Sequence, residues 1–343
     1  MNIKNLEKVL VNEPAYRIKQ AKEAVFKNFI SDWNEATFFT KDLREKLNNE
    51  CPLSIKSEVL VSKDKDSIKA KIKLSDGLEI ESVLMRHKDG RNTVCVSCQV
   101  GCPLGCLFCA TGKMGLKRNL SVNEILEQVI FFSRYLKSDR SRASITNVTF
   151  MGMGEPFLNY ENVMDAIKIL NNKDFFNIGA RSISVSTAGI VEGIEKFTNE
   201  GLQLNLAISL HAPNEKLRSE LMPISKKYPL AKVLQAVDKY ILKTKRKVMF
   251  EYVLIKDVND SDQCARELAK LMRKKLYFVN LILYNPSPIS TQALKSLITQ
   301  TRLPAGRQVE AFKKILEKEK INFVQRYRFG DDIKAACGQF ATN

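Results

Sequence analysis

The stretch "CVSCQVGCPLGCLFC", Cys95–Cys109, places five of the chain's eight cysteines within fifteen residues. A zinc site is one interpretation, because two C-x2-C pairs can be drawn, Cys95/Cys98 and Cys106/Cys109. Only seven residues separate these pairs, whereas roughly 12 to 20 are usual between zinc knuckles. A buried group of free thiols is the second interpretation, and five thiols in one loop argue against it.

Three of these cysteines, Cys102, Cys106 and Cys109, form a C-x3-C-x2-C pattern. Thiolates at such short spacings are typical ligands of iron–sulfur clusters. Three ligands on a four-iron cluster leave one iron open, as catalytic metal sites require. The glycines and the proline between the cysteines allow the loop to wrap closely around a cluster. We therefore expect one [4Fe-4S] cluster held by these three cysteines.

The composition places the chain among globular proteins. Its 343 residues are 44% apolar, which is enough for a sizeable core. The opening "MNIKNLEKVL" interleaves charges with apolar residues, and no apolar run is long enough to span a membrane. We therefore expect a cytoplasmic protein without membrane attachment. In that compartment clustered cysteines bind metals or act in catalysis.

The charge balance indicates a polyanionic partner. Lys and Arg outnumber Asp and Glu by 55 to 38, a formal net charge of +17. Part of this excess belongs to a solvated surface, but its size favours nucleic acid as the partner. Basic groups recur along the chain at 117–118, 226–227, 243–247 and 273–275.

The first 75 residues differ from the remainder. Apolar residues have helical spacing in "YRIKQAKEAVFKNFI" (16–30), and Thr40 can cap a second helix in "TKDLREKL" (40–47). The alternating "SIKAKIKL" (67–74) predicts a strand. We assign residues 1–75 to a mostly helical, RNA-binding accessory domain and residues 76–343 to a catalytic core.

The core alternates between strands and helices. We expect strands at 93–98, 147–151, 182–186, 204–210, 248–254 and 278–283, and helices near 121–137, 160–171, 190–199, 229–243 and 261–274. Six βα repeats imply an α/β fold with parallel strands and right-handed crossovers. A doubly wound sheet is possible, but polar residues follow nearly every strand, which favours a full or partial barrel. We expect loops at 138–144 and 288–308.

The C-x3-C-x2-C pattern after the first barrel strand resembles the radical S-adenosylmethionine (SAM) superfamily. Further motifs resemble the RlmN/Cfr family of RNA methyltransferases; they include "FCATGKMGLKRNL", "MGMGEP", "SVSTAG", "AISLHAPN", "GDDI" and "AACGQ". The resemblance implies a partial (βα)6 radical-SAM barrel with a small helical N-terminal domain. It also implies methylation of carbon 2 of an adenosine in 23S rRNA, and of the adenosine next to the anticodon in some tRNAs.

The resemblance further implies how the cofactor is bound and used. In the superfamily the open iron chelates the methionine end of SAM, and electron transfer cleaves it to a 5′-deoxyadenosyl radical. Gly154 and Glu155 of "GMGEP" match the positions that grip the methionine end, with the carboxylate accepting from its ammonium. The other matching cofactor positions are Ser186, Ser209, Leu210, His211 and Asn285.

Two cysteines outside the cluster match the family's reactive thiols. Adenine carbon 2 is electron-poor and cannot attack a sulfonium methyl, whereas a thiolate can. The resemblance implies that Cys337 takes a methyl from one SAM molecule, and that the radical from a second removes a hydrogen from it. The methylene radical adds to the ring and Glu81 removes the ring proton. Cys95 then attacks the Cys337 sulfur and releases the product, leaving a disulfide.

The implied partners are 23S rRNA and tRNA, an electron donor such as flavodoxin or ferredoxin, and a thiol reductant; we expect a monomer. Cys98 stands where the family has a small hydroxyl residue, and 287–307 departs from the family loop. Phe329 in "RFGDDI" resembles the Cfr branch, so carbon-8 methylation is the alternative activity. A non-enzymatic iron–sulfur RNA-binding protein is a further alternative, but it leaves Glu81, Cys95 and Cys337 unexplained.

Overall fold

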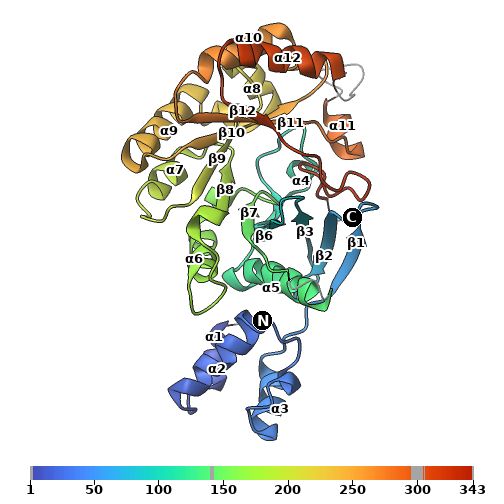
Figure 1. The fold of residues 1–343 in the computed structure, drawn as a ribbon, viewed down its shortest axis with the longest axis vertical. Coiled ribbons are helices and arrows are strands. Elements are labelled where there is room, and N and C mark those ends of the chain that lie inside the picture. Colours follow the sequence, from blue (N-terminus) through green and yellow to red (C-terminus); the bar gives the residue numbers. More distant parts are fainter. Residues whose placement is uncertain (1–2, 140–142, 295–303, 305, 342–343) are drawn as a thin grey trace.

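The computed structural model describes residues 3–139, 143–294, 304 and 306–341. Its main feature is a ten-stranded sheet in the order β1-β2-β3-β4-β7-β8-β9-β10-β11-β12 (Figure 1). The strands of this sheet are β1 (Ser57–Val61), β2 (Ser67–Lys73), β3 (Glu79–Arg86), β4 (Asn92–Cys95), β7 (Asn147–Phe150), β8 (Ile183–Thr187), β9 (Asn205–Ser209), β10 (Val248–Leu254), β11 (Tyr277–Leu283) and β12 (Phe323–Gln325). A separate hairpin pairs β5 (Gln99–Cys102) with β6 (Gly115–Asn119).

Within the main sheet every ladder from β4 across to β12 is parallel, whereas β3 pairs antiparallel with β4. Six of the parallel strands, β4 and β7 to β11, are the six strands predicted from the sequence. Among the described strands, β1 and β12 form the two edges and do not pair with each other, so the barrel is open. The predicted α/β class with a partial barrel of six βα units is confirmed.

The crossover helices cover one side of the sheet, and α4, α11 and the C-terminal segment lie on the other (Figure 1). Neighbouring helices pack in the pairs α5–α6, α7–α9 and α10–α12. The helices of the core are α4 (Ala110–Lys113), α5 (Val122–Ser138), α6 (Tyr160–Asn171), α7 (Val191–Phe197), α8 (Glu215–Leu221), α9 (Leu230–Thr244), α10 (Asp262–Leu271), α11 (Pro288–Leu294) and α12 (Gly306–Lys318). No helix in the described ranges is long and apolar enough to cross a membrane.

Helix α5 shows how local sequence sets these elements. Ser121 caps it, and Glu124 returns a hydrogen bond to complete a capping box. Ile125, Val129 and Phe132 recur at helical spacing and are fully buried against the sheet. The capping signal and the apolar periodicity therefore agree, and the helix lies where the sequence predicts it.

The prediction of a loop at 288–308 is wrong at both ends, where α11 and the start of α12 are helical. Ser287 caps α11, because its hydroxyl accepts from the Ser290 N–H at 3.1 Å, and Pro288 occupies the first helical position. Ser and Pro mark helix starts as well as loops, which explains the error. Residues 295–303 and 305, and residues 140–142 of the other expected loop, lie outside the described residues.

The N-terminal helices are α1 (Ile3–Val9), α2 (Ala15–Phe26) and α3 (Lys41–Glu50). They surround a hydrophobic cluster of their own, centred on the fully buried Trp33, whose indole N–H donates to the Cys51 carbonyl at 2.8 Å. The strands β1 and β2 instead extend the main sheet through antiparallel pairing with β3. The helical part of residues 1–75 thus packs separately from its strands.

A buried arginine ties the carboxyl ends of two neighbouring strands together. Arg218 of α8 is fully buried. Its guanidinium donates to the carbonyl of Ala188, just after β8, at 2.6 Å, and to that of Ser209, at the end of β9, at 3.3 Å. A third bond reaches the Ser225 hydroxyl at 2.7 Å. One side chain therefore satisfies carbonyl groups that the irregular strand ends leave without a ladder partner.

We predict that Arg218→Met lowers the free energy of unfolding by about 2–4 kcal/mol, because two buried carbonyls lose their donor. Denaturant titration of the protein measures the change. Arg273→Met is the matched control, because Arg273 forms an exposed ion pair with Glu319 at 3.1 Å and its loss should cost within about 0.5 kcal/mol. Equal effects of the two substitutions would show that the carbonyl contacts are not stabilising.

Candidate functional site

A cavity opens at the carboxyl edge of the parallel strands. It encloses about 910 Å3 free of protein atoms, part of it open to solvent. Parallel strands end at the same edge, so loops that are distant in sequence converge there. Ten of the residues predicted from the sequence line it: Cys102, Cys106, Cys109, Gly154, Glu155, Ser186, Ser209, His211, Asn285 and Cys337.

The three closely spaced cysteines form one wall of this cavity. Cys102 ends β5, and Cys109 immediately precedes α4. Burial raises the pKa of Cys102 to about 12, and the Leu104 amide opposes this shift. Burial also raises the pKa of Cys109, against hydrogen bonds from Gly112 and Thr111. Amides that point at sulfur favour the thiolate, the form that binds metal.

Three cysteine thiols in the lining of one cavity are the donor set that iron–sulfur clusters take, and their role as cluster ligands stays a prediction. Within the described ranges, no group of three or more Cys, His, Asp or Glu side chains is placed to hold one metal ion. The thiolates of a four-iron cluster bind different iron atoms and do not converge on one point. Iron would also supply the positive charge that deprotonates buried thiols.

Glu155 supplies a buried carboxyl group to the lining of the same cavity. Its two oxygens accept from the N–H groups of Phe157 at 3.1 Å and Ala188 at 2.8 Å. Burial raises its pKa to about 7 in spite of these bonds. Gly154 has φ +101°, and a Cβ there would lie 2.6 Å from the Gln99 Cβ. The backbone of this motif therefore needs glycine because it passes close to Gln99, and the predicted close approach to the cofactor stays a prediction.

His211 is held as a neutral ring. Its Nδ1 accepts from the Val253 N–H at 3.1 Å, and its ring meets Phe108 edge-on with centroids 4.6 Å apart. Burial and the charge of Arg218 lower its pKa to about 3. The predicted neighbour Leu210 differs, because its side chain is buried in the main core and is not among the residues lining the cavity.

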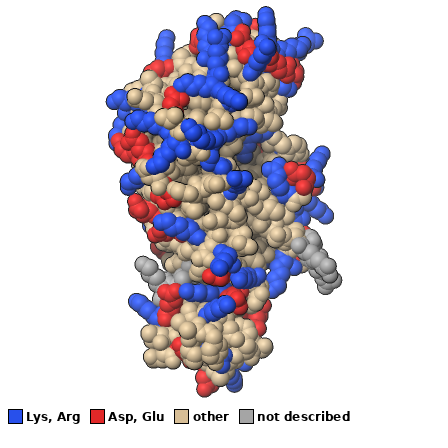
Figure 2. All heavy atoms as spheres, turned by 60° about the vertical axis from the view of Figure 1, so that its left-hand side comes forward, with Lys and Arg blue, Asp and Glu red and all other residues tan. Residues whose placement is uncertain are grey.

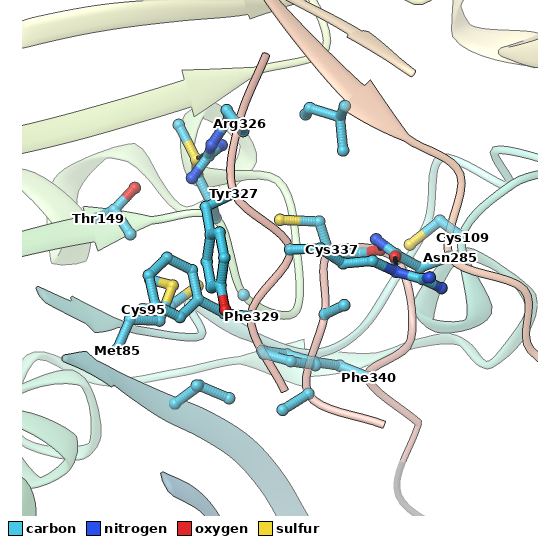
Figure 3. A pocket seen from close by; sticks show the side chains of 18 of the residues that line it. Met85, Cys95, Cys109, Thr149, Asn285, Arg326, Tyr327, Phe329, Cys337 and Phe340 are labelled. Carbon is cyan, nitrogen blue, oxygen red and sulfur yellow. Dashed lines mark hydrogen bonds between the residues drawn. The ribbon is translucent and has the colours of Figure 1, made fainter. Parts of the chain in front are cut away.

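Cys337 also lines a second, adjoining pocket, which contains Cys95 (Figure 3). Cys109 belongs to both linings as well. Cys337 is exposed, whereas Cys95 is buried at the end of β4. Burial raises the pKa of Cys95 to about 12, a nearby Cys337 charge adds to the shift, and Arg326 opposes it. The two thiols predicted to react in sequence thus share one space.

The segment that carries Cys337 is fastened directly to the cluster loop. The Ala110 N–H donates to the Gly338 carbonyl at 2.8 Å, and the Thr111 hydroxyl donates to the Phe340 carbonyl at 2.6 Å. Both donors belong to α4, which starts directly after Cys109. On the other side the Asn285 amide donates to the Cys337 carbonyl at 3.2 Å. Asn285, predicted to touch the cofactor, lines the first cavity and also holds the backbone of Cys337 in place.

Glu81 is not among the residues that line either cavity. It lies on β3, where it pairs with the Lys69 ammonium at 3.1 Å and accepts from the Ala341 N–H at 3.2 Å. Burial raises its pKa, and Lys69 opposes the shift. The structure therefore brings Glu81 beneath the C-terminal segment, and its acid–base role stays a prediction.

Two charged residues that line the first cavity, Glu251 and Arg326, were not predicted from the sequence. The Glu251 carboxylate lies 3.3 Å from the Arg326 guanidinium and accepts from the Asn280 amide at 2.8 Å. A single carboxylate inside the apolar strand "VMFEYVL" was an available signal, because buried charges need partners. Arg326 follows the last strand in an irregular segment, where the sequence carries no comparable signal.

Comparison with known proteins agrees with this geometry. Residues 96–269 match the model of the radical SAM superfamily. A probable dual-specificity RNA methyltransferase RlmN from Dictyoglomus thermophilum is 44% identical over 95% of this chain and 90% of that protein. A second such RlmN, from Protochlamydia amoebophila, is 41% identical over 96% of this chain and 89% of that protein.

A solved structure of a radical SAM methyltransferase from Sphaerobacter thermophilus superimposes with a TM-score of 0.91. It is 41% identical and covers 99% of this chain, which in turn covers 97% of that chain. The sequence and the fold of the two proteins thus agree over almost the full length of this chain. The chain therefore belongs to the radical SAM superfamily and, within it, to the RlmN/Cfr family of RNA methyltransferases.

Proposed function

We propose that this protein methylates carbon 2 of an adenosine in 23S rRNA, and of an adenosine in tRNA, through a methyl group carried on Cys337. The observation that carries the proposal is the place of Cys337 in the linings of both cavities. A carrier has to reach the methyl source on one side and the acceptor on the other. The RlmN relatives are named dual-specificity RNA methyltransferases, which supports RNA as the methyl acceptor.

The residues of the first cavity are the proposed cofactor site. Cys102, Cys106 and Cys109 would hold the [4Fe-4S] cluster, and Gly154 with Glu155 the methionine end of SAM. When bound, these groups supply the radical that takes a hydrogen from the methyl on Cys337. One SAM molecule serves as methyl donor and another as radical source, so each turnover uses two.

The two thiols outside the cluster motif have different proposed roles, in keeping with their different exposure to solvent. Cys337 is accessible and acts as the methyl-accepting nucleophile. Cys95 is buried, and the nearby Arg326 favours its thiolate. Glu81 takes the ring proton once Ala341 has moved off its carboxylate, and the ring gives up the unpaired electron left by radical addition, for which the cluster would be the acceptor. The Cys95 thiolate then attacks the Cys337 sulfur and forms a Cys95–Cys337 disulfide. The electron pair of the broken carbon–sulfur bond stays on the transferred carbon, which takes up a proton and becomes the methyl group.

The RNA would be held by the basic surface. Figure 2 shows Lys and Arg side chains spread over one face of the molecule, with acidic groups between them. A groove between the N-terminal helices and the core is lined by Lys27, Lys137 and Lys173 together with Phe29 and Phe175. Lysines suit the phosphate backbone, which positions RNA without reading its sequence. The flavodoxin- or ferredoxin-type electron donor, the thiol reductant, the monomeric state and the cytoplasmic location belong to the same proposal.

The proposed activity is tested by mass spectrometry of nucleosides from 23S rRNA fragments and tRNA incubated anaerobically with the reconstituted protein. We expect 2-methyladenosine with wild-type protein and with Cys98→Ala, whose thiol is buried outside the cavity lining. Cys102→Ala should give none and should lose iron. Formation of 8-methyladenosine would replace the proposed activity by the carbon-8 alternative, which Phe329 favours.

We predict that SAM binding depends on the ionisation of Glu155. A carboxyl group of pKa about 7 is ionised at pH 8 and mostly protonated at pH 6, so its contribution to affinity should fall roughly tenfold between these values. Equilibrium dialysis of cluster-loaded wild type and Glu155→Gln measures the ratio of their affinities, which cancels titration of SAM itself. At pH 8 the variant should bind roughly 10- to 100-fold more weakly. A ratio that stays constant with pH would exclude this role.

We predict that Cys95→Ala stalls after carbon transfer, because it lacks the thiol that breaks the link between Cys337 and the RNA. The variant purified from cells should carry covalently attached RNA, visible as a ribonuclease-sensitive shift in denaturing electrophoresis. Cys337→Ala and the double variant should carry none, because no methyl carrier exists. Normal turnover by Cys95→Ala is the result that would disprove the resolving role.

A further inference from the structure

Three aromatic side chains line the pocket that contains Cys95 and Cys337, and none has a part in the proposed chemistry. Phe340 is buried in the main core, whereas Tyr327 and Phe329 are more accessible. Figure 3 shows the rings of Tyr327 and Phe329 next to each other on the Cys95 side, with Cys337 across the pocket. The rings meet edge-on, with centroids 4.8 Å apart and planes at 73°.

The two rings are held differently. Phe329 is half-buried, and His87 meets its ring edge-on with centroids 4.8 Å apart. Tyr327 keeps 58% of its surface exposed. A tyrosine exposed to this extent gains little from burial in the fold. Phe329 is thus a supported ring at the wall of the pocket, and Tyr327 an accessible ring beside it.

The chemistry of the site requires a flat apolar partner at this place. An enzyme that modifies a base within structured RNA has to take that base out of its stack, which costs stacking energy. Aromatic side chains replace the lost stacking and accept any base that presents its face. The carbon radical carried on Cys337 adds to a ring carbon from the face of the base, so one face of the base has to lie toward Cys337. The opposite face then lies against the wall that Tyr327 and Phe329 form.

We infer that Tyr327 and Phe329 form the platform for the purine ring of the target nucleotide, which stacks on one ring and meets the other edge-on, opposite Cys337. This subsite rests on the proposed function, since it needs an RNA base as substrate. It also gives a role to Phe329, which has no part in the proposed chemistry. The competing interpretation is a cap that only keeps water from the thiols. A cap protects the thiols whether or not a base is present, whereas a platform makes affinity depend on the base.

The experiment compares two RNAs that differ only in the base. One is the shortest stem-loop that the wild-type protein methylates, and the other has an abasic site at the target position. Affinities come from fluorescence anisotropy with cluster-loaded wild type, Tyr327→Leu and Phe329→Leu. Wild type should prefer the adenosine stem-loop by about tenfold or more. Each leucine variant, which keeps apolar bulk but has no ring, should lose most of this preference.

Two further variants separate stacking from loss of structure. Phe329→Tyr retains a ring and should keep the preference of the wild type. Phe278→Leu is the matched control, because Phe278 is also half-buried but lies at the amino end of β11, where its ring contacts the Lys247 ammonium at 4.6 Å. It should keep the preference as well. Iron content and melting temperature verify that all variants are folded.

The outcomes distinguish this inference from the function on which it rests. Loss of the base preference in both leucine variants, with retention in Phe329→Tyr and Phe278→Leu, supports the platform. An unchanged preference in both leucine variants assigns the rings to a cap and overturns the platform, while RNA binding and methylation stand. If the wild type methylates no stem-loop or binds neither RNA, the proposed function fails and the platform fails with it.

Discussion

Parallel pairing of neighbouring strands is the interaction on which the rest of this molecule depends. In the main sheet every ladder from β4 across to β12 is parallel, so the carboxyl ends of these strands meet at one edge. The loop with three cysteines, the Gly-Glu motif and His211 gather there as a result. Arg218 fixes two of the strand ends through their carbonyls, so the cavity wall is tied to the buried core.

The C-terminal segment adds a second layer to this edge. Backbone and hydroxyl donors of α4 bind it on one side, and Asn285 and Glu81 bind it on the other. Each of these single hydrogen bonds contributes about 1 kcal/mol, and Ala335 and Phe340 of the segment also pack into the main hydrophobic core. Together these contacts hold Cys337 in the linings of both pockets.

Burial sets the charge state of the site in opposite directions for acids and bases. It raises the pKa of Glu155 to about 7 and that of Cys95 to about 12, and it lowers that of His211 to about 3. All three groups thus favour their neutral forms, because the low-dielectric interior penalises charge of either sign. The ionisation of groups of this kind responds strongly to a charged partner.

The sequence by itself determined the local features of this protein. The cluster motif spans few residues, the six βα units follow from periodicity, and Gly154 follows from backbone sterics. The family resemblance of the sequence already implied that Cys95 meets Cys337. Only the tertiary structure decided the other distant contacts: Glu251 with Arg326, Glu81 with Ala341, and Tyr327 and Phe329 with the thiol pocket. Spacing along the chain fixes contacts within a turn or a loop, whereas contacts between elements depend on strand register and packing of the whole sheet.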